Sequence, residues 1–542
     1  MKSGTIKTNK SWSTIFTIAF LWLFYSLFVI VPVFFVLLSA GRQDFEAVFG
    51  TTRFLSSIKN TVIECISSTL VSVVFGYIYA YAVVRGNLPF RKFFAAVPVI
   101  HMVTPPFVGG LSFILLFGRQ GFITKTLLGL DISLYGFWGL LLSQVLCFFP
   151  LAYLICVQTL TGINPAIEQA ARSMGAGRSK IFFTVTLPLS LSGIASALLF
   201  IAVSVLSDFG NPLIVGGRFK VLAVEVYTQL TGWLNTGTSA VLGLILLVPS
   251  VILFIAQNKM MKKNALKLAT IGGKGSAASN NSVSKAANIM LTIFCSLLSF
   301  LILAQLFSLF AGAFQKLWGI NTSFTFDHIK AVWGYKAHLF NSIVLAFISA
   351  VAATSIAAVT AYFSQRTHIS SGSALDTVSQ LPSAIPGTLF GIALAYGAHA
   401  VKFRGSALLI VIAMTVSYLP FSYRICSSTF SRLKLTLDEA GRSLGADRFK
   451  VFTSIILPLS AGGIFSSFTY DFVRGVGTLS SVIFLVSFKT SLASVKILNL
   501  AEQGDWGKSA ALALVLTLIT FIILGVGRIL IRRFEYNIWN SD

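Results

Sequence analysis

The chain has 542 residues, of which 55% are hydrophobic and only 11% are charged. Soluble domains carry about 25% charged residues, so this composition excludes an ordinary soluble protein and indicates an integral membrane protein. The formal net charge of +24 is better explained by Lys and Arg in cytoplasmic loops than by nucleic-acid binding.

Long apolar runs predict membrane-spanning helices. Runs of about 20 apolar residues are typical of such helices, whereas the strands of a membrane β-barrel are short and alternate in hydrophobicity. The first run follows a basic N-terminus and has no small-residue cleavage site, which predicts a membrane helix rather than a removed signal peptide. We expect an all-α polytopic membrane protein with about twelve spans, at 14–40, 61–84, 93–117, 132–160, 191–207, 239–257, 287–314, 342–363, 378–397, 405–427, 461–486 and 509–530.

A polar segment separates two halves. Residues 258–286 are rich in Lys, Gly, Ser and Asn, a composition that cannot bury a core and predicts a flexible cytoplasmic linker. The sequence therefore predicts a first repeat at 1–257 and a second repeat at 287–542, each with six spans. Lys and Arg gather in the linker and in the other segments on its side of the membrane, so the positive-inside rule places both termini in the cytoplasm.

The two halves are copies of one another. QAARSMGAGRSKIFFTVTLPLS (169–190) aligns without gaps with EAGRSLGADRFKVFTSIILPLS (439–460), and this pairing of Gln169 with Glu439 defines the repeat register. Upstream, the segment from Asn60 resembles the segment from Asn341 in a slightly shifted register, which a short insertion in the first half explains. Both copies keep the same number and orientation of spans, which predicts parallel repeats related by an axis along the membrane normal.

The repeated segment interrupts the apolar pattern with a short helix on the predicted cytoplasmic side. Its helix formers run from Ala166 to Met174 in the first copy and from Leu437 to Leu444 in the second. Each run ends at a glycine, Gly175 or Gly445, and glycine is favoured at a helix C-terminus. The proline of a later Leu-Pro pair suits the first turn of the next membrane helix.

Small residues in this short helix predict a docking surface. Ala170 and Ala171 in one copy, and Ala440 and Gly441 in the other, would let another backbone approach closely inside a rim of basic side chains. Such a patch suits a groove on a soluble partner. The alternative is an amphipathic loop that lies on anionic headgroups. Repetition with glycine and proline in register favours docking.

The pattern Glu-x-Ala-Ala-x-x-x-Gly-Ala followed by Leu-Pro resembles the EAA loop of binding-protein-dependent ABC importer permeases. It stands here as IEQAARSMGAG…TLPL and LDEAGRSLGAD…ILPL. The second copy has Gly441 where the first has Ala171, and the first has Gln169 where the second has Glu439. The resemblance covers nearly the whole chain, because each half also has six predicted spans, and it implies the type I ABC importer permease fold.

In that family the loop forms a coupling helix that sits in a cleft of an ATP-binding subunit. The resemblance therefore implies two ATP-binding cassette ATPase subunits as partners, an extracytoplasmic substrate-binding protein, and a place in the bacterial cytoplasmic (inner) membrane. The residues that the resemblance assigns to ATPase coupling are Glu168, Gln169, Ala170, Ala171, Gly175, Glu439, Ala440, Gly441 and Gly445.

Two further stretches bear on the substrate. SDFGNPLIVGG (207–217) and FVRGVGTLSSVIFLVS (472–487) resemble the fused permeases of ferric-iron importers, a group that includes thiamine and 2-aminoethylphosphonate importers. Ferric iron is expected first, an organophosphorus compound such as 2-aminoethylphosphonate second, and thiamine third. An ion-coupled secondary transporter is the alternative of another class, but it would have no use for a doubled docking helix.

No enzyme active site is evident in the sequence. IGGKGSA in the linker lacks the spacing of a phosphate-binding loop, so ATP hydrolysis is expected on a separate subunit and no cofactor is expected on this chain. The five cysteines form no CxxC pair, so no metal site is predicted.

Polar residues within the predicted spans are candidates for the transport path. Asp208 ends the fifth span, where the alternative is simple helix termination. Asp471 and Arg474 lie three residues apart on one helix face, so the alternative for them is a local ion pair. Glu64 lies early in the second span, and its alternative is a place at the outer interface.

Prolines and glycines recur at matching places in the third and ninth spans. Pro106 and Pro386 mark these predicted interruptions. Interrupted helices in both halves suggest a central pathway or gate. The alternative is kinking that only improves packing.

Overall fold

The computed structural model describes residues 12–103, 106–130, 134–271, 284–367, 369–401, 403 and 407–539. Helices dominate, as the apolar runs predict, and the only sheet in these ranges is a two-stranded antiparallel hairpin. The elements of the first half are α1 (Trp12–Tyr25), η1 (Ser26–Ile30), α2 (Val31–Ser39), α3 (Arg42–Gly50), α4 (Thr52–Arg85), α5 (Arg91–Val103), α6 (Pro106–Phe117), η2 (Phe122–Leu127), α7 (Phe137–Gly162), α8 (Pro165–Ser173), α9 (Arg178–Ile181), η3 (Phe182–Thr186), α10 (Leu187–Leu206), α11 (Gly210–Val215), α12 (Leu222–Thr231) and α13 (Thr236–Ile271). Those of the second half are α14 (Lys285–Phe314), β1 (Gln315–Leu317), β2 (Asn321–Phe324), α15 (Asp327–Val332), η4 (Trp333–Tyr335), α16 (Lys336–Gln365), α17 (Gly372–Gln380), η5 (Leu381–Ala384), α18 (Gly387–Ala400), α19 (Ala407–Phe430), α20 (Thr436–Ser443), α21 (Arg448–Val451), η6 (Phe452–Ile456), α22 (Leu457–Leu459), α23 (Ala461–Val476), α24 (Ala493–Glu502) and α25 (Trp506–Trp539).

Among the described residues, nine helices are long and apolar enough to cross a membrane, or up to eleven if each of two bent pairs is one span. The sequence predicts twelve, and the difference lies in broken spans. The expected span at 93–117 is divided between α5 and α6. The expected span at 378–397 is bent by 102° between η5 and α18. Pro386 stands at this bend with an extended ψ of 136°, and proline has no amide hydrogen with which to continue the helix. The expected span at 461–486 is helical only as α23, which is bent by 82° from the preceding helix and ends at Val476, so its predicted C-terminal part is wrong.

The predicted linker begins as helix. α13 continues to Ile271, so the stretch 258–271 extends the last helix of the first half. Residues 272–283 of the expected linker lie outside the described residues.

The two halves repeat the same helix packing. α4, α7 and α10 contact one another in the first half, as do α16, α19 and α23 in the second. A Cβ atom on Gly193 of α10 would lie 2.0 Å from Thr159 Oγ1, and a Cβ atom on Gly463 of α23 would lie 2.2 Å from Thr429 Oγ1. The two pairs are equivalent in the repeat register, and in each the glycine lets two membrane helices approach closely.

The first helix of each half packs against the other half. α1 contacts α16, where Tyr25 Oη and Thr360 Oγ1 lie 3.0 Å apart. α14 contacts α4, α5 and α6, and here Tyr79 Oη and Ser299 Oγ lie 2.8 Å apart. Tyr79 and Thr360 are equivalent in the upstream register that pairs Asn60 with Asn341. This reciprocal exchange joins the halves into one unit.

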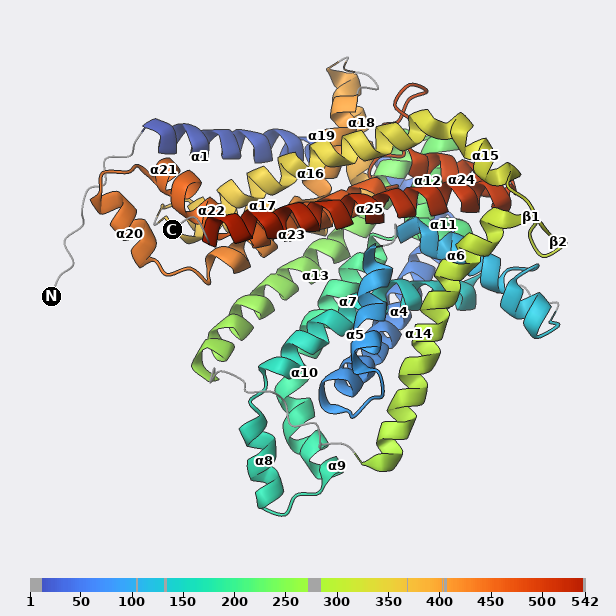
Figure 1. Ribbon diagram of the computed structural model, residues 1–542. Coiled ribbons are helices and arrows are strands. Elements are labelled where there is room, and N and C mark those ends of the chain that lie inside the picture. The colour runs from blue at the N-terminus through green and yellow to red at the C-terminus, as the bar shows by residue number, and fades with distance from the viewer. Residues whose placement is uncertain are drawn as a thin grey trace.

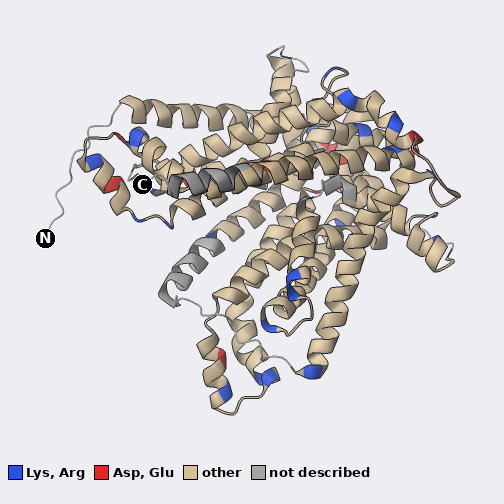
Figure 2. Cartoon of the chain, viewed as in Figure 1, with Lys and Arg blue, Asp and Glu red and all other residues tan. Residues whose placement is uncertain are grey.

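Figure 1 shows two bundles of helices that diverge from a shared end. α8 and α9 lie at the tip of the lower arm, α20 and α21 lie at the tip of the left arm, and α11, α12 and α24 gather at the shared end. Charged residues lie mostly at the two tips and at the shared end, and the helices between them carry few charges (Figure 2). Such a distribution leaves the middle of the molecule apolar toward lipid.

Candidate functional site

The predicted coupling helices α8 and α20 end in the same way. Gly175 has a φ of +84° and Gly445 has a φ of +86°, a region that glycine enters without strain. In the first copy the amide of Ala176 donates to the carbonyl of Ala171 at 3.1 Å, and the amide of Gly175 donates to that of Arg172 at 2.9 Å. These two bonds form a Schellman motif, and the second copy repeats both. The prediction that these glycines end the helices is confirmed.

Glu168 anchors the first loop to the end of α4. Its carboxylate accepts a hydrogen bond from Arg85 Nε at 3.1 Å and another from Thr186 Oγ1 at 2.9 Å. The Arg85 guanidinium also donates to the carbonyl of Leu160 at 3.1 Å, and Arg85 is only 1% exposed. A buried ion pair of this kind is costly to break, because removal of either partner leaves a buried charge without compensation. Glu168 therefore holds α8 from inside the protein.

Asp438 takes the equivalent position in the second loop. Arg366, which directly follows α16, donates to its carboxylate through Nε at 3.0 Å and also through Nη2. The other Arg366 hydrogen bonds reach three backbone carbonyls between the end of α19 and α20, at 2.6 to 2.9 Å. Glu439 is exposed. Sequence analysis missed Asp438, although the repeat register places it opposite Glu168.

Two of the predicted small residues face inward. Ala171 and Gly441 are buried. A Cβ atom on Gly441 would lie 3.0 Å from side-chain atoms of both Val451 and Ile455. The small side chains at this position therefore allow each short helix to pack against the following one.

An exposed face remains on each short helix. Met174 is 82% exposed and Leu444 is 89% exposed, and these two residues occupy equivalent positions at the helix ends. Large apolar side chains so exposed at a polar end of the molecule are candidates for contact with another protein. The predicted coupling residues that are exposed beside them are Gln169, Ala170, Gly175, Glu439, Ala440 and Gly445.

The second loop has an additional contact with α1. Ser13 Oγ donates to Asp447 Oδ2 at 2.7 Å, and the amide of Lys450 donates to Oδ1 at 2.8 Å. These two hydrogen bonds hold the pKa of Asp447 below its ordinary value. Gly177 stands at the equivalent position of the first loop and has no side chain for such a contact.

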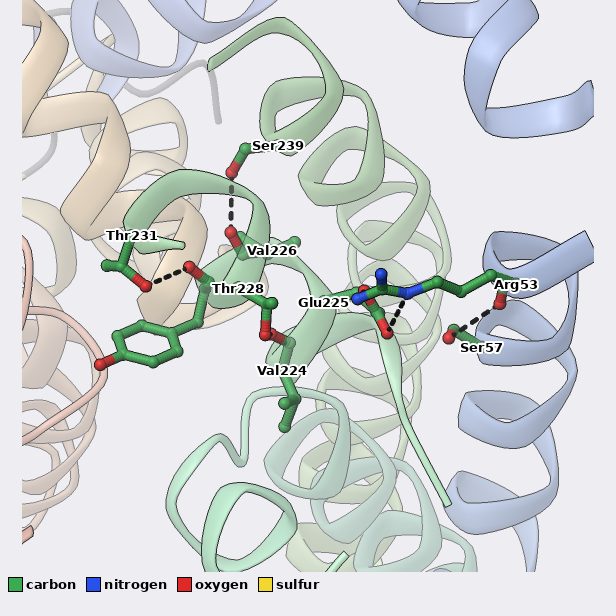
Figure 3. A network of polar contacts seen from close by, with 9 residues as sticks. Arg53, Ser57, Val224, Glu225, Val226, Thr228, Thr231 and Ser239 are labelled. Carbon is green, nitrogen blue, oxygen red and sulfur yellow. Dashed lines mark hydrogen bonds and ion pairs between the residues drawn. The ribbon is translucent and has the colours of Figure 1, made fainter. Parts of the chain in front are cut away.

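At the shared end, Arg53 of α4 pairs with Glu225 of α12, with Nη2 and Oε2 2.7 Å apart (Figure 3). Glu225 is fully buried. The amide that opens α12 donates to Thr61 Oγ1 at 2.8 Å, and the amide that opens α24 donates to Ser342 Oγ at 2.8 Å. The same hydroxyl contact therefore attaches a short helix to the long helix α4 or α16 in each half.

A cavity of about 240 Å³ lies between the halves. The first half lines it with Asp208 and Phe200, and the second half lines it with Arg424, Tyr470 and Arg474. Aromatic and hydroxyl groups make up much of the remaining wall. The cavity therefore has charged and hydroxyl groups set in a largely apolar wall.

Two of the predicted path residues meet in this cavity, and a third does not. Asp208 is half-buried and accepts a hydrogen bond from Gln144 Nε2 at 3.0 Å, while Arg474 lines the opposite wall. Asp471 instead points into the second bundle, where Thr354 Oγ1 donates to it at 3.2 Å. Asp471 and Arg474 form no ion pair with each other among the residues that the structure describes. The alternative of a local ion pair is therefore not observed.

The other predicted path residues have different surroundings. Glu64 is only 4% exposed and accepts a hydrogen bond from Gln144 Nε2 at 2.6 Å, so it is enclosed between helices of the first half. Pro386 is buried, and its neighbours Ile385 and Gly387 line the cavity. Pro106 begins α6, and its side chain lies outside the described residues.

Residues 72–263 and 369–536 match the model of a family described as the binding-protein-dependent transport system inner membrane component. The chain belongs to this family. It is 30% identical over 475 residues to the ferric transport system permease protein FbpB of Actinobacillus pleuropneumoniae, covering 84% of this chain and 68% of that protein. It is 30% identical over 441 residues to the putative ferric transport system permease protein FbpB 1 of Haemophilus influenzae, covering 78% of this chain and 68% of that protein. A third similarity, 32% over 170 residues, is to the molybdenum transport system permease protein ModB of Escherichia coli, covering 30% of this chain and 74% of that protein.

As a permease of this family, the chain provides the membrane passage of an ABC importer. ATP is bound and hydrolysed by partner subunits, and an extracytoplasmic binding protein delivers the substrate. The permease is therefore neither an enzyme nor the holder of a cofactor, and the expected partners are confirmed.

Each short helix of the permease is connected to the cavity by continuous or bent helix. Arg178–Leu206 forms one span from the first loop to a point two residues before Asp208. Arg448–Leu459 and Ala461–Val476, bent by 82°, connect the second loop to the helix that carries Arg474. A displacement of α8 or α20 would move these cavity residues, because packed helices transmit motion as rigid bodies.

Proposed function

We propose that this permease imports ferric iron across the bacterial inner membrane. Two relatives that share most of this chain's length are named as ferric transport permeases, and this similarity is the observation that carries the proposal. 2-Aminoethylphosphonate and thiamine are the competing substrates that the sequence leaves open.

We further propose that α8 and α20 each dock on one ATP-binding subunit. The exposed side chains Met174 and Leu444 would enter apolar pockets of those subunits, with Ala170 and Ala440 beside them. The buried carboxylates Glu168 and Asp438 would keep the two helices rigid during ATP-driven closure. Rigid helices are needed here because a loop that yields under force would not transmit it.

The proposed topology has both termini and the linker in the cytoplasm, on the side of α8 and α20. The basic residues that surround both short helices support this orientation through the positive-inside rule (Figure 2). The proposed repeats are 1–257 and 287–542, joined by the segment 258–286. Labelling single cysteines near the linker from either side of the membrane tests the orientation, and accessibility only from outside would contradict it.

Uptake into proteoliposomes tests the substrate. Vesicles that contain the permease and its ATPase subunits would receive the binding protein loaded with radioactive ferric iron, with 2-aminoethylphosphonate or with thiamine. We expect uptake of iron that requires both ATP and the binding protein. Uptake of only one of the other two compounds would refute the ferric proposal.

A further inference from the structure

Neither arginine of the cavity forms an ion-pair contact within the described part of the chain. Arg424 donates from Nε to Gln380 Oε1 at 3.1 Å and from Nη2 to Asn258 Oδ1 at 3.4 Å, and both acceptors are neutral amides. Arg474 forms no ion pair within the described part of the chain, and its Nε is buried without a hydrogen-bond partner. The second half therefore brings two guanidinium groups to the cavity without an ion-pair contact, although the carboxylates of Asp208 and Asp376 act on Arg474 and Arg424 from a greater distance.

The first half contributes one carboxylate to the cavity, and its hydrogen-bond donors are also neutral amides. Asp208 accepts hydrogen bonds from Asn211 Nδ2 at 2.9 Å and Gln144 Nε2 at 3.0 Å. Within the described ranges, Asp208 takes part in no ion pair. The amide donors fix the direction of the carboxylate, which lies within electrostatic reach of Arg474 but forms no ion-pair contact with it, so its oxygens can still receive a cation.

Charges in the middle of a membrane protein are costly unless they have a partner. A guanidinium group presents a planar fork of donors that matches the oxygens of a carboxylate, carbonate or phosphate group. A carboxylate provides an oxygen ligand for a hard cation or a contact for an ammonium group. The opposite walls of the cavity therefore fit the two ends of a small molecule with separated charges.

We propose that this cavity binds a substrate that contains both an oxyanion and a cationic centre. Arg474 and Arg424 hold the oxyanion, and Asp208 contacts the cationic centre. The inference rests on the proposed import function. For a ferric importer, it means that iron passes through the permease as a complex with an oxyanion such as carbonate or phosphate, and not as the bare ion. An aminoalkylphosphonate zwitterion has the same separation of charges and is the second source of this chemistry.

Transport of doubly labelled substrate distinguishes the two sources. Proteoliposomes with the complete transporter would receive the binding protein loaded with labelled iron and labelled carbonate or phosphate, or with labelled 2-aminoethylphosphonate. Iron and oxyanion entering in equal amounts supports the ferric complex. Entry of the phosphonate without iron would overturn the ferric proposal and support this inference. Entry of iron without any labelled oxyanion would overturn this inference and leave the ferric proposal intact.

Charge-neutralising variants test the residues themselves. Arg474→Gln, Arg424→Gln and Asp208→Asn should each lower the uptake rate at least about tenfold, the effect of losing one charge-assisted contact. ATP hydrolysis stimulated by the loaded binding protein should continue, because the coupling loops are unchanged. Arg474→Lys should retain part of the uptake, and Arg42→Gln, an exposed arginine of α3, should retain all of it.

Two results would contradict this assignment. Uptake at the wild-type rate in both arginine variants would exclude the oxyanion contact. Recovery of full uptake when Asp208→Asn is combined with Arg474→Gln would show that these residues serve only each other, as an ion pair that forms when the cavity closes.

Discussion

Glu168→Gln should loosen the loop of α8 more than Asp438→Asn loosens the loop of α20. The reason is that the arginines paired with these carboxylates, Arg85 and Arg366, keep different hydrogen-bond acceptors. Without the carboxylate charge, Arg85 retains the carbonyls of Leu160 at 3.1 Å and Ile163 at 3.5 Å. Arg366 retains three carbonyl acceptors at 2.6 to 2.9 Å. The first loop therefore depends more strongly on its carboxylate.

The expected magnitudes follow from these contacts. Removing one partner of a buried ion pair costs about 3–5 kcal/mol, whereas one hydrogen bond to a charged group contributes about 1.5–3 kcal/mol. Glu168→Gln weakens the bonds from Arg85 and Thr186 and removes the negative charge beside a buried guanidinium, so about 3 kcal/mol of local stability should be lost. Asp438→Asn should cost about 1.5 kcal/mol, since Arg366 stays hydrogen-bonded.

Hydrogen exchange of α8 and α20 in the complete transporter measures this difference. Exchange should become faster in α8 of the first variant than in α20 of the second, and uptake per ATP hydrolysed should fall in the same order. Glu46→Gln is the matched control, because this carboxylate of α3 is exposed and its pair with Arg42 adds little. If the amides of α8 were equally protected from hydrogen exchange in Glu168→Gln and in the wild type, the reasoning would be refuted.

A double replacement tests whether the ion pair acts only as an anchor. Buried ion pairs replaced by apolar residues of similar size often retain or gain stability. Arg85→Met with Glu168→Met should therefore restore the protection of α8 and the transport that Glu168→Gln loses. Restored protection without restored transport would show that the charge has a role beyond holding the helix.

Three further changes test other parts of the structure. Gly175→Val should cost about 1–2 kcal/mol and lower uptake per ATP, because its φ is +84°, whereas Gly177→Val at a φ of −67° should have little effect; equal effects would contradict this explanation. Gly463→Ala places a Cβ atom 2.2 Å from a threonine hydroxyl and should lower thermal stability by about 1–3 kcal/mol; an unchanged melting temperature would contradict the close packing. Ser13→Ala should raise the pKa of Asp447 towards its unfolded value of about 3.9. A depressed pKa in the folded protein stabilises the fold at pH values above the unfolded pKa of about 3.9, and this stabilisation is lost as pH falls through the folded pKa. The melting temperatures of the variant and the wild type should therefore differ slightly at neutral pH and converge as pH falls below about 4.

The number of spans shows what apolar composition leaves out. Hydropathy identifies the apolar runs and their approximate limits, and most of the long helices lie where it predicts them. It does not distinguish a straight helix from two helices that meet at 102°, because that bend depends on the backbone angles around Pro386. The stretch 258–271 is helical despite its charge, because Lys, Ala and Leu are good helix formers.

The ends of the short helices α8 and α20 could be predicted from the sequence, whereas the ion pairs that hold these helices could not. The helix ends at Gly175 and Gly445 follow from local chemistry, and the structure confirms them. Arg85 and Arg366 lie 83 and 72 residues from their carboxylates in the sequence, so no local pattern predicts these pairs. Asp438 could have been found from the repeat register alone.

The predicted path residues show a different limit. Asp471 and Arg474 share a helix face by their spacing, yet Asp471 enters the bundle of its own half and Arg474 enters the cavity between the halves. Spacing gives the angle around a helix, whereas the length and the direction of the side chain decide which space it reaches.

The two copies differ in polar character where the cavity lies. In the repeat register, Asp208 stands opposite Thr478, Arg474 stands opposite Ser204, and Tyr470 stands opposite Phe200. All six of these residues line the cavity. The anchors at the tips, by contrast, keep an arginine and a carboxylate in both copies. Two loops of the same structure can receive two ATPase subunits of the same structure. A cavity with its carboxylate on one wall and its guanidinium groups on the other can bind a substrate in only one orientation. The duplicated chain therefore has matched parts where we propose that the ATPase subunits dock and unmatched parts where a small charged substrate would pass.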